Sequence, residues 1–364
     1  LPDSGAIANS GNLSVGKNLT LVSNNLDLQG QLQAGGNLTL QAANHLRVRD
    51  SISNPFIAAA GQQLLVQGNK IDIFALNHPS SGFFSGQNMT FRSANPIGGN
   101  AHFYSGGNFT LENINGNRGD LSSTDDPIIR ASGDVSFNSY TGASLHIFAG
   151  GSVNIDSIEI TGTEPNNFIN ETVTLSDGVT RVAINGNLEP TVDIRAGTTN
   201  FNPTGITGNG TGFSPTPTSG TATSADININ RIIAPGGLVF LTNQYQPNPA
   251  LSGNISVNSI QTANLIGGGD VVIDSRGRIT SRNMDVSGGN SVDLTFNGRG
   301  GDITLISTSD IFIPYPSRIV SYGLGGGNIT LKSNSAIIQE PPPSGSSDSS
   351  LLESAVFNSG TAGD

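Results

Sequence analysis

Three carboxylates in one short stretch are the residues of this sequence best suited to chemistry. Asp120, Asp125 and Asp126 lie within Gly-Asp-Leu-Ser-Ser-Thr-Asp-Asp-Pro, residues 119–127. Several converging carboxylate oxygens bind Ca²⁺, and two carboxylates about 5 to 9.5 Å apart can hydrolyse a glycosidic bond. The same composition is typical of a solvated turn, and no accompanying histidine motif supports a glycosidase. We therefore predict a polar loop, with these three residues as a candidate Ca²⁺ site and with no catalytic residue.

The four histidines do not form a second candidate site. They are widely separated, and none has another histidine or a carboxylate at metal-ligand spacing; they are His45, His78, His102 and His146. The sequence also lacks a G-x-S-x-G nucleophile motif, and no glycine-rich phosphate loop precedes a helical pattern. We therefore expect a protein that is not an enzyme and that needs no cofactor.

A six-residue unit recurs along the chain, and the structure that it forms determines where the candidate functional side chains lie. Residues 35–40 are Gly-Gly-Asn-Leu-Thr-Leu, and close variants occupy residues 16–21, 86–91, 106–111, 300–305 and 326–331. In a strand the two apolar side chains point to one face and the threonine to the other. The pattern predicts inward Leu38, Leu40, Phe109, Leu111, Ile303, Leu305, Ile329 and Leu331, with outward Thr39, Thr110, Thr304 and Thr330.

The polar part of the unit predicts a corner. Glycine tolerates a positive φ at a sharp turn, so we expect that conformation at Gly35 and Gly36. Asparagine can hydrogen-bond the backbone of the turn, and asparagine side chains stacked coil on coil can hydrogen-bond one another as an amide ladder. The candidate ladder residues are Asn18, Asn37, Asn88, Asn108 and Asn328.

The spacing of the units indicates a solenoid. The asparagines are 19 residues apart between Asn18 and Asn37 and 20 apart between Asn88 and Asn108. Further short strands lie between the units, including residues 182–184 and 192–194. Two or three short strands per coil predict an all-β parallel β-helix of about a dozen coils. The alternative is a β-sandwich, whose strands are usually longer and joined by hairpins.

Composition excludes several classes of partner. The 364 residues carry a net charge of -11, have a pI of about 4.6 and contain no cysteine. An acidic chain without a Lys/Arg cluster repels phosphate backbones, so nucleic acid is not an expected partner. No apolar run approaches the ~20 residues of a transmembrane helix, so we expect no transmembrane segment. The start at Leu1 without a basic and apolar leader suggests a processed or excised piece.

The pattern divides the chain into four parts. Residues 1–196 and 227–339 carry the repeat, so we expect two parts of one rod. Residues 163–171 resemble a loop that leaves a coil, and residues 197–226 are a longer Gly/Thr/Pro-rich insertion. Residues 340–364 form a Pro/Ser-rich tail whose prolines cannot donate to a ladder.

The repeat resembles that of filamentous-haemagglutinin-like exoproteins, and its irregular coil lengths are most similar to the cyanobacterial members. The likeness spans Gly11 to Gln339 and lies in the Gly-Gly-Asn-Leu-Thr-Leu units and the cysteine-free, Gly/Asn-rich composition. The resemblance implies a right-handed β-helix, two-partner secretion and an extracellular or cell-surface location, often with an adhesive role. The family's N-P-N-L and N-P-N-G export motifs are missing, and the most similar segment is Asn95-Pro96-Ile97-Gly98.

These observations support three functional hypotheses. The first is a structural or adhesive rod that assembles head to tail into a surface or matrix filament, with copies of itself as partners. Its uncapped ends would pair with another chain, and Leu351, Leu352, Val356 and Phe357 of the tail would serve as a docking strand. The second is a monomeric adhesin that binds carbohydrate or a cell surface, with polysaccharide as its partner. The third is a polysaccharide lyase or hydrolase.

Overall fold

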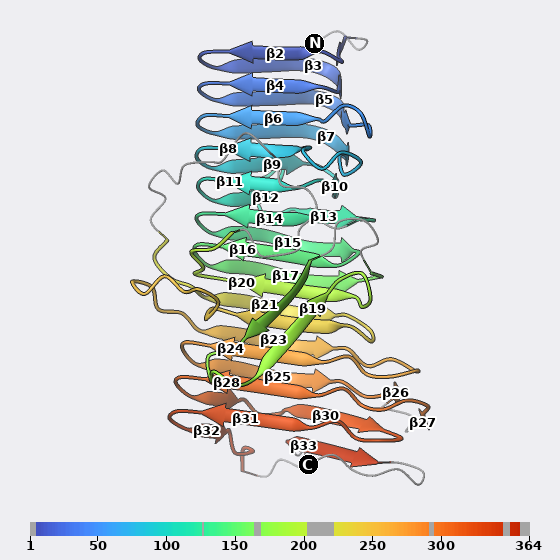
Figure 1. Cartoon of the computed structure of the whole chain (residues 1–364), viewed down its shortest axis with the longest axis vertical. Coiled ribbons are helices and arrows are strands. Elements are labelled where there is room, and N and C mark those ends of the chain that lie inside the picture. The colour runs from blue at the N-terminus through green and yellow to red at the C-terminus, as the bar shows by residue number, and fades with distance from the viewer. Residues whose placement is uncertain are drawn as a thin grey trace.

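The computed structural model is a rod of stacked coils whose N-terminal and C-terminal coils lie at opposite ends (Figure 1). It describes residues 5–125, 127–163, 169–201, 222–290, 295–344 and 350–356. All regular structure in these residues is β-strand, and the two large sheets are parallel. The predicted all-β parallel β-helix is therefore confirmed. No helix in these described ranges could cross a membrane.

One strand per coil forms the first face of the rod, a sheet of 12 parallel strands, which confirms about a dozen coils. Its strands are β2 (Asn12–Val15), β4 (Gln31–Ala34), β6 (Ile57–Ala60), β8 (Gly82–Ser85), β11 (Phe103–Ser105), β14 (Ile128–Ala131), β16 (Leu145–Ala149), β20 (Thr191–Arg195), β22 (Leu238–Thr242), β24 (Val271–Ser275), β28 (Ile303–Ser307) and β31 (Ile329–Ser333).

The second and third faces together make up a sheet of 17 strands. Some strands run through both faces, and the register shifts where β5 bends between Ala42 and His45. In other coils two short strands replace the long one. The strands are β1 (Ala6–Asn9), β3 (Leu19–Leu28), β5 (Leu38–Arg49), β7 (Leu64–Phe74), β9 (Met89–Ser93), β10 (Ile97–Asn100), β12 (Phe109–Asn113), β13 (Asp120–Ser123), β15 (Val135–Gly142), β17 (Val153–Ile160), β21 (Ile227–Ile233), β23 (Ile255–Gln261), β25 (Ile279–Asp285), β29 (Ile311–Ile313), β30 (Arg318–Gly323), β32 (Ile337–Gln339) and β33 (Leu351–Val356).

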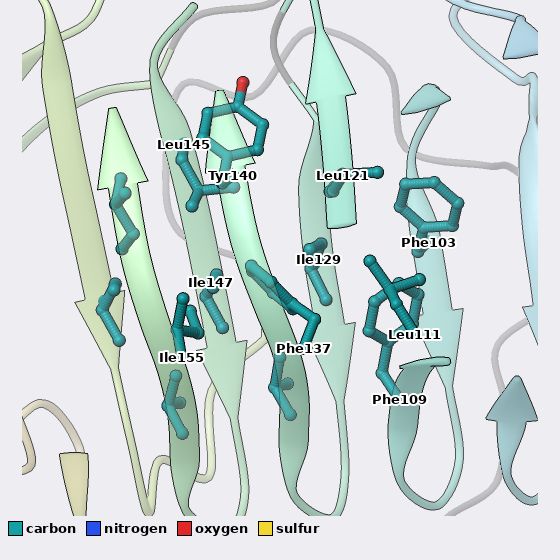
Figure 2. Packing of buried hydrophobic residues seen from close by; sticks show 14 of the residues in the cluster. Phe103, Phe109, Leu111, Leu121, Ile129, Phe137, Tyr140, Leu145, Ile147 and Ile155 are labelled. Atoms are coloured by element: carbon teal, nitrogen blue, oxygen red, sulfur yellow. The ribbon is translucent and has the colours of Figure 1, made fainter. Parts of the chain in front are cut away.

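The three faces enclose one continuous apolar core. Figure 2 shows part of it, with Phe109 and Leu111 of one coil beside Ile129 and Phe137 of the next. The predicted register is confirmed: the expected inward residues are fully buried up to Leu305, and Ile329 and Leu331 in the last coil pack against the same core. The four threonines of the repeat are partly exposed on the outer side. Burial of this core is the main source of stability in such a fold.

The corner glycines have a different role from the one expected. Positive φ occurs at other glycines, such as Gly30 and Gly116, but not at Gly35 or Gly36. A Cβ on Gly35 would clash with the carbonyl oxygen of Gly16, and one on Gly36 with Oδ1 of Asn18. The expectation of positive φ was wrong, because the corner needs glycine for the close approach of the next coil.

The hydrogen bonds between stacked corners also differ from the expected ladder of side-chain amides. Oδ1 of Asn18 accepts a hydrogen bond from the backbone N–H of Asn37 at 2.9 Å, and Oδ1 of Asn88 accepts from the N–H of Asn108 at 2.9 Å. Because only an oxygen acceptor is needed, aspartate can take the same place: Oδ1 of Asp134 accepts from the N–H of Ser152 at 2.7 Å. Side chains are thus bonded to backbone, not to one another, at these corners.

The repeat unit occupies two different corners of the rod. In the N-terminal part it precedes the second face, as at Asn108 before β12. In the C-terminal part it precedes the first face, where Asp302 accepts from the N–H of Asn328 before β31 at 2.8 Å. Asn328 therefore belongs to a separate ladder from Asn18, Asn37, Asn88 and Asn108.

A hairpin leaves the rod where the sequence suggested a loop. Strands β18 (Asn170–Thr174) and β19 (Arg181–Asn185) pair antiparallel. The prediction that residues 182–184 form a coil strand was wrong, whereas residues 192–194 do lie in β20. A shorter antiparallel pair joins β26 (Gly289–Asn290) and β27 (Thr295–Phe296). Most of the insertion, residues 202–221, and residues 164–168 lie outside the described residues.

Candidate functional site

The first coil leaves apolar side chains and strand edges open at the N-terminal end of the rod. Strand β1 pairs in the described structure with β3, and β2 with β4. Leu13 occupies a core position in β2, since it pairs with the buried Leu32, yet it is 39% exposed. This end therefore exposes the backbone donors and acceptors of its strand edges together with apolar side chains of the core.

Among the residues that the structure describes, the last coil likewise leaves strand edges and apolar side chains open at the opposite end. Strand β31 pairs with β28, and β32 pairs with β29. Ile337 aligns with the buried Ile311 but is 51% exposed. An open parallel edge with apolar residues beside it is a template for another strand.

The tail strand lies on its own rod. Residues Leu351–Val356 form β33, which pairs parallel with β30 of the same chain, so Leu351 and Leu352 are not free to dock elsewhere in this structure. The N–H of Leu351 donates to the carbonyl of Ser317 at 2.9 Å, and the Tyr322 hydroxyl donates to the carboxylate of Glu353 at 3.0 Å. The side chain of Val356 and the whole of Phe357 lie outside the described residues. A tethered strand reaches a nearby edge at a high effective concentration.

The structure places the Ca²⁺ candidates in separate hydrogen-bond networks. Asp120 accepts from the amide of Asn138 at 2.7 Å and from the hydroxyl of Ser139 at 2.6 Å. Asp125 accepts from the amide of Asn100 at 2.6 Å. Asp126 lies outside the described residues, and within the described ones no group of three or more potential ligands could hold a metal ion. Both placed carboxylates tie neighbouring coils together.

A buried charged cluster lies on the outer side of the first face. His146, Asp193 and Arg195 occupy outward positions of β16 and β20, and each is 0% exposed. Nδ1 of His146 is 3.2 Å from a carboxylate oxygen of Asp193, and Arg195 donates to the same carboxylate at 2.9 Å. The Arg195 guanidinium also stacks on the ring of Tyr245, 4.1 Å from its centroid.

The β18–β19 hairpin covers this cluster and completes it. Glu171 of β18 forms an ion pair with Arg195 at 2.9 Å and accepts from the Tyr245 hydroxyl at 2.9 Å. Apolar hairpin residues, among them Val173 and Ile184, pack against outward residues of the first face such as Phe240. The hairpin therefore shields His146, Asp193 and Arg195 from solvent, and its Glu171 carboxylate pairs with the buried Arg195 charge.

The pKa shifts fit a structural cluster. Burial by itself would raise the pKa of Asp193, but the charge of Arg195 and the hydrogen bonds from His146 and Arg195 outweigh it, so the pKa is lowered. Burial, with the nearby charge of Glu171 adding to it, raises the pKa of Tyr245 to about 12. The Asp193 carboxylate is therefore ionised and the Tyr245 phenol neutral at physiological pH.

The tip of the hairpin is fixed farther along the rod. The backbone N–H and hydroxyl of Ser176 donate to Asp274 of β24 at 2.8 and 2.5 Å. Asp177 forms an ion pair with Lys332 of β31 at 2.8 Å. The hairpin thus runs along the rod across several coils, as Figure 1 shows.

Sequence reasoning missed this cluster. A signal was present, since β20 reads Thr-Val-Asp-Ile-Arg and places an acid and a base at outward positions. Phe148 and Phe240 also stand at outward positions of the same face, where a solvated sheet would carry polar residues. Together these residues indicate an outer face that another element must cover.

Comparison with family models, with curated proteins and with solved structures finds no match for this chain.

Proposed function

We propose that this chain is a non-enzymatic structural or adhesive rod that assembles head to tail through the open strand edges of its end coils. The observation that carries the proposal is the alignment of the two ends. On the first face one continuous row of core residues starts at the exposed Leu13 and ends at the half-buried Leu331. A second copy would place its Leu13 over Leu331 and extend both the sheet and the core.

Apolar burial and strand pairing both favour this contact. The side chains exposed at the ends would leave water, at roughly 25 cal/mol per Å² of apolar surface. The unpaired N–H and C=O groups would gain partners at the same time. Since one end differs from the other, the contact is heterologous. Because each added copy continues the same rod axis, the contact does not close into a ring and produces a filament.

The covered charged cluster is consistent with a structural role. A catalytic group must reach its substrate, whereas His146, Asp193 and Arg195 are sealed beneath the hairpin. The Gly/Asn-rich repeat and the resemblance to filamentous-haemagglutinin-like exoproteins support an extracellular or cell-surface location for such a filament.

Light scattering across a concentration series tests the proposal. Leu13→Asp and Ile337→Asp each place a charge in one end contact and should abolish assembly. The matched control is Ile266→Asp, because Ile266 is 86% exposed on a lateral loop and belongs to neither end. Concentration-dependent growth that both end variants lose and the control retains supports the proposal.

Two other results would reject it. If wild type remains monomeric at every concentration, the chain does not assemble through its ends. If Ile266→Asp suppresses growth as strongly as Leu13→Asp, the contact is lateral. Monomers that bind immobilised polysaccharide would favour the adhesin hypothesis, and release of oligosaccharides from it would favour the lyase or hydrolase.

A further inference from the structure

The third face of the rod has one more strand than the other two. Its core row begins at Ile7 of β1 and ends at Leu352 of β33. The first-face row begins only at β2 and ends at β31, and the second-face row begins at Leu19 of β3 and ends at Ile337 of β32. The chain therefore has a third-face strand both before its first complete coil and at its last coil.

This additional third-face strand determines how two copies can stack end to end. Consider a second copy whose β2 pairs with β31 and whose Leu19 segment of β3 pairs with β32. Its β1 directly precedes β2 and must then occupy the third-face position next to β30. In the single chain β33 already fills that position, paired with β30 from Arg318 to Gly323.

The alternative contact leaves the ends open. If β1 of the second copy paired with the outer edge of β33 instead, its β2 would lie two coils beyond β31. The edges of β31 and β32 would remain unpaired, and Ile337 would stay exposed. The stacking that buries all three faces thus requires β33 to leave.

We propose that β33 is an intramolecular cap that occupies the site of the next copy's β1, so that assembly proceeds by strand exchange at β30. This inference rests on the head-to-tail assembly proposed above. The two strands are matched: each places one aliphatic residue at the core position beside Ile319, Leu352 in β33 and Ile7 in an incoming β1.

The cap is held by contacts that can be exchanged. Leu352 is 47% exposed although it lies at a core position, so β33 covers the end of the core only in part. Leu351 and Ala355 pack on a small cluster of Val320, Tyr322 and Phe296 that is separate from the main core. An incoming β1 would bring β2 and β3 with it and so bury two further edges that β33 does not cover.

A disulfide lock tests the exchange directly. Val320 and Glu353 are paired in register on adjacent strands, where the Cα separation suits a disulfide. Because the chain has no cysteine, the double variant Val320→Cys/Glu353→Cys can form only this bond within one molecule. Electron microscopy and light scattering of the oxidised protein, with the reduced form of the same protein as its matched control, measure assembly.

The oxidised variant should lose assembly, and the reduced form should regain it. A chain ending at Glu340 should assemble at lower concentration than wild type, and Ile7→Asp in that shortened chain should abolish the gain. Circular dichroism should show a β-rich fold in all of them, with the shortened chain lacking only the six strand residues of β33. If the oxidised variant assembles as well as the reduced one, strand exchange is wrong although head-to-tail assembly stands. If neither wild type nor the shortened chain assembles, the proposed function fails.

Discussion

Replacing Asn108 by alanine should loosen one corner of the rod by a predictable amount. Oδ1 of Asn108 accepts the backbone N–H of Asp134 at 2.9 Å, while the N–H of Asn108 itself donates to Asn88. Asn108→Ala removes the first bond and leaves the second intact. A lost hydrogen bond with a partly buried donor left behind costs about 1 to 2 kcal/mol.

The matched control is Asn108→Asp. It keeps an oxygen at the same place, and Asp134 already performs this role one coil farther on, where it accepts from the N–H of Ser152. We therefore expect Asn108→Asp to lose less than half the stability that Asn108→Ala loses. An amide ladder would predict the opposite, because a carboxylate cannot donate to a neighbouring amide.

Hydrogen exchange at the Asp134 amide is the appropriate assay, because solenoids can open locally without global unfolding. A cost of about 1 to 2 kcal/mol should speed exchange at that amide roughly 5- to 30-fold if local opening controls it. Amides in the distant first coil should be unchanged. Equal acceleration in Asn108→Asp and Asn108→Ala would refute the reasoning.

Three further predictions follow from the core, from a buried histidine and from the hairpin. Leu111→Ala should cost about 2 to 5 kcal/mol in urea unfolding because it leaves a cavity in the core; a smaller loss would mean that Leu111 is not tightly packed, although it is 0% exposed. Burial, with the charges of Arg130 and His146, lowers the pKa of His102 to about 3. The contribution of the neutral His102 to the free energy of unfolding is therefore complete above pH 6.5 and decreases as the pH falls toward 3. His102→Leu should flatten that part of the stability profile, and an unchanged profile would contradict the assignment. Glu171→Gln should lower the pKa of Tyr245 from about 12, since the Glu171 charge helps to raise that pKa. An ultraviolet phenolate titration measures the pKa, and Tyr245→Phe identifies which part of the absorbance belongs to Tyr245. An unchanged pKa would mean that Glu171 does not act on Tyr245.

Alternation and spacing in the repeat were enough to predict the parallel β-helix and the register of its core. Leu38 and Leu40 flank a threonine, and this pattern admits only one inward face in a strand. The corners were less predictable. A Gly-Gly-Asn corner is compatible with positive φ or with close packing, and only the position of Gly16 and Asn18 in the preceding coil distinguishes them.

The covered face and the tail could not be predicted from local pattern. The covering hairpin contacts residues as far away in sequence as Asp274 and Lys332, and nothing in the repeat specifies such distant contacts. The apolar strand of the tail was identified and was expected to dock on another copy, whereas it pairs with β30 of its own chain. A short apolar strand fits any open edge, and its tether to the rod favours β30 of the same chain.

The axial repeat of the assembled protein tests the central claim most directly, because the contact between copies determines it. If β2 follows β31 without a gap, each copy contributes 12 coils, and helical reconstruction by electron cryomicroscopy should give a repeat of about 58 Å at ~4.8 Å per coil. The density at β30 should belong to β1 of the next copy. A repeat longer by one coil, about 62 Å, would mean that β33 stays in place, and isolated rods at every concentration would contradict head-to-tail assembly altogether.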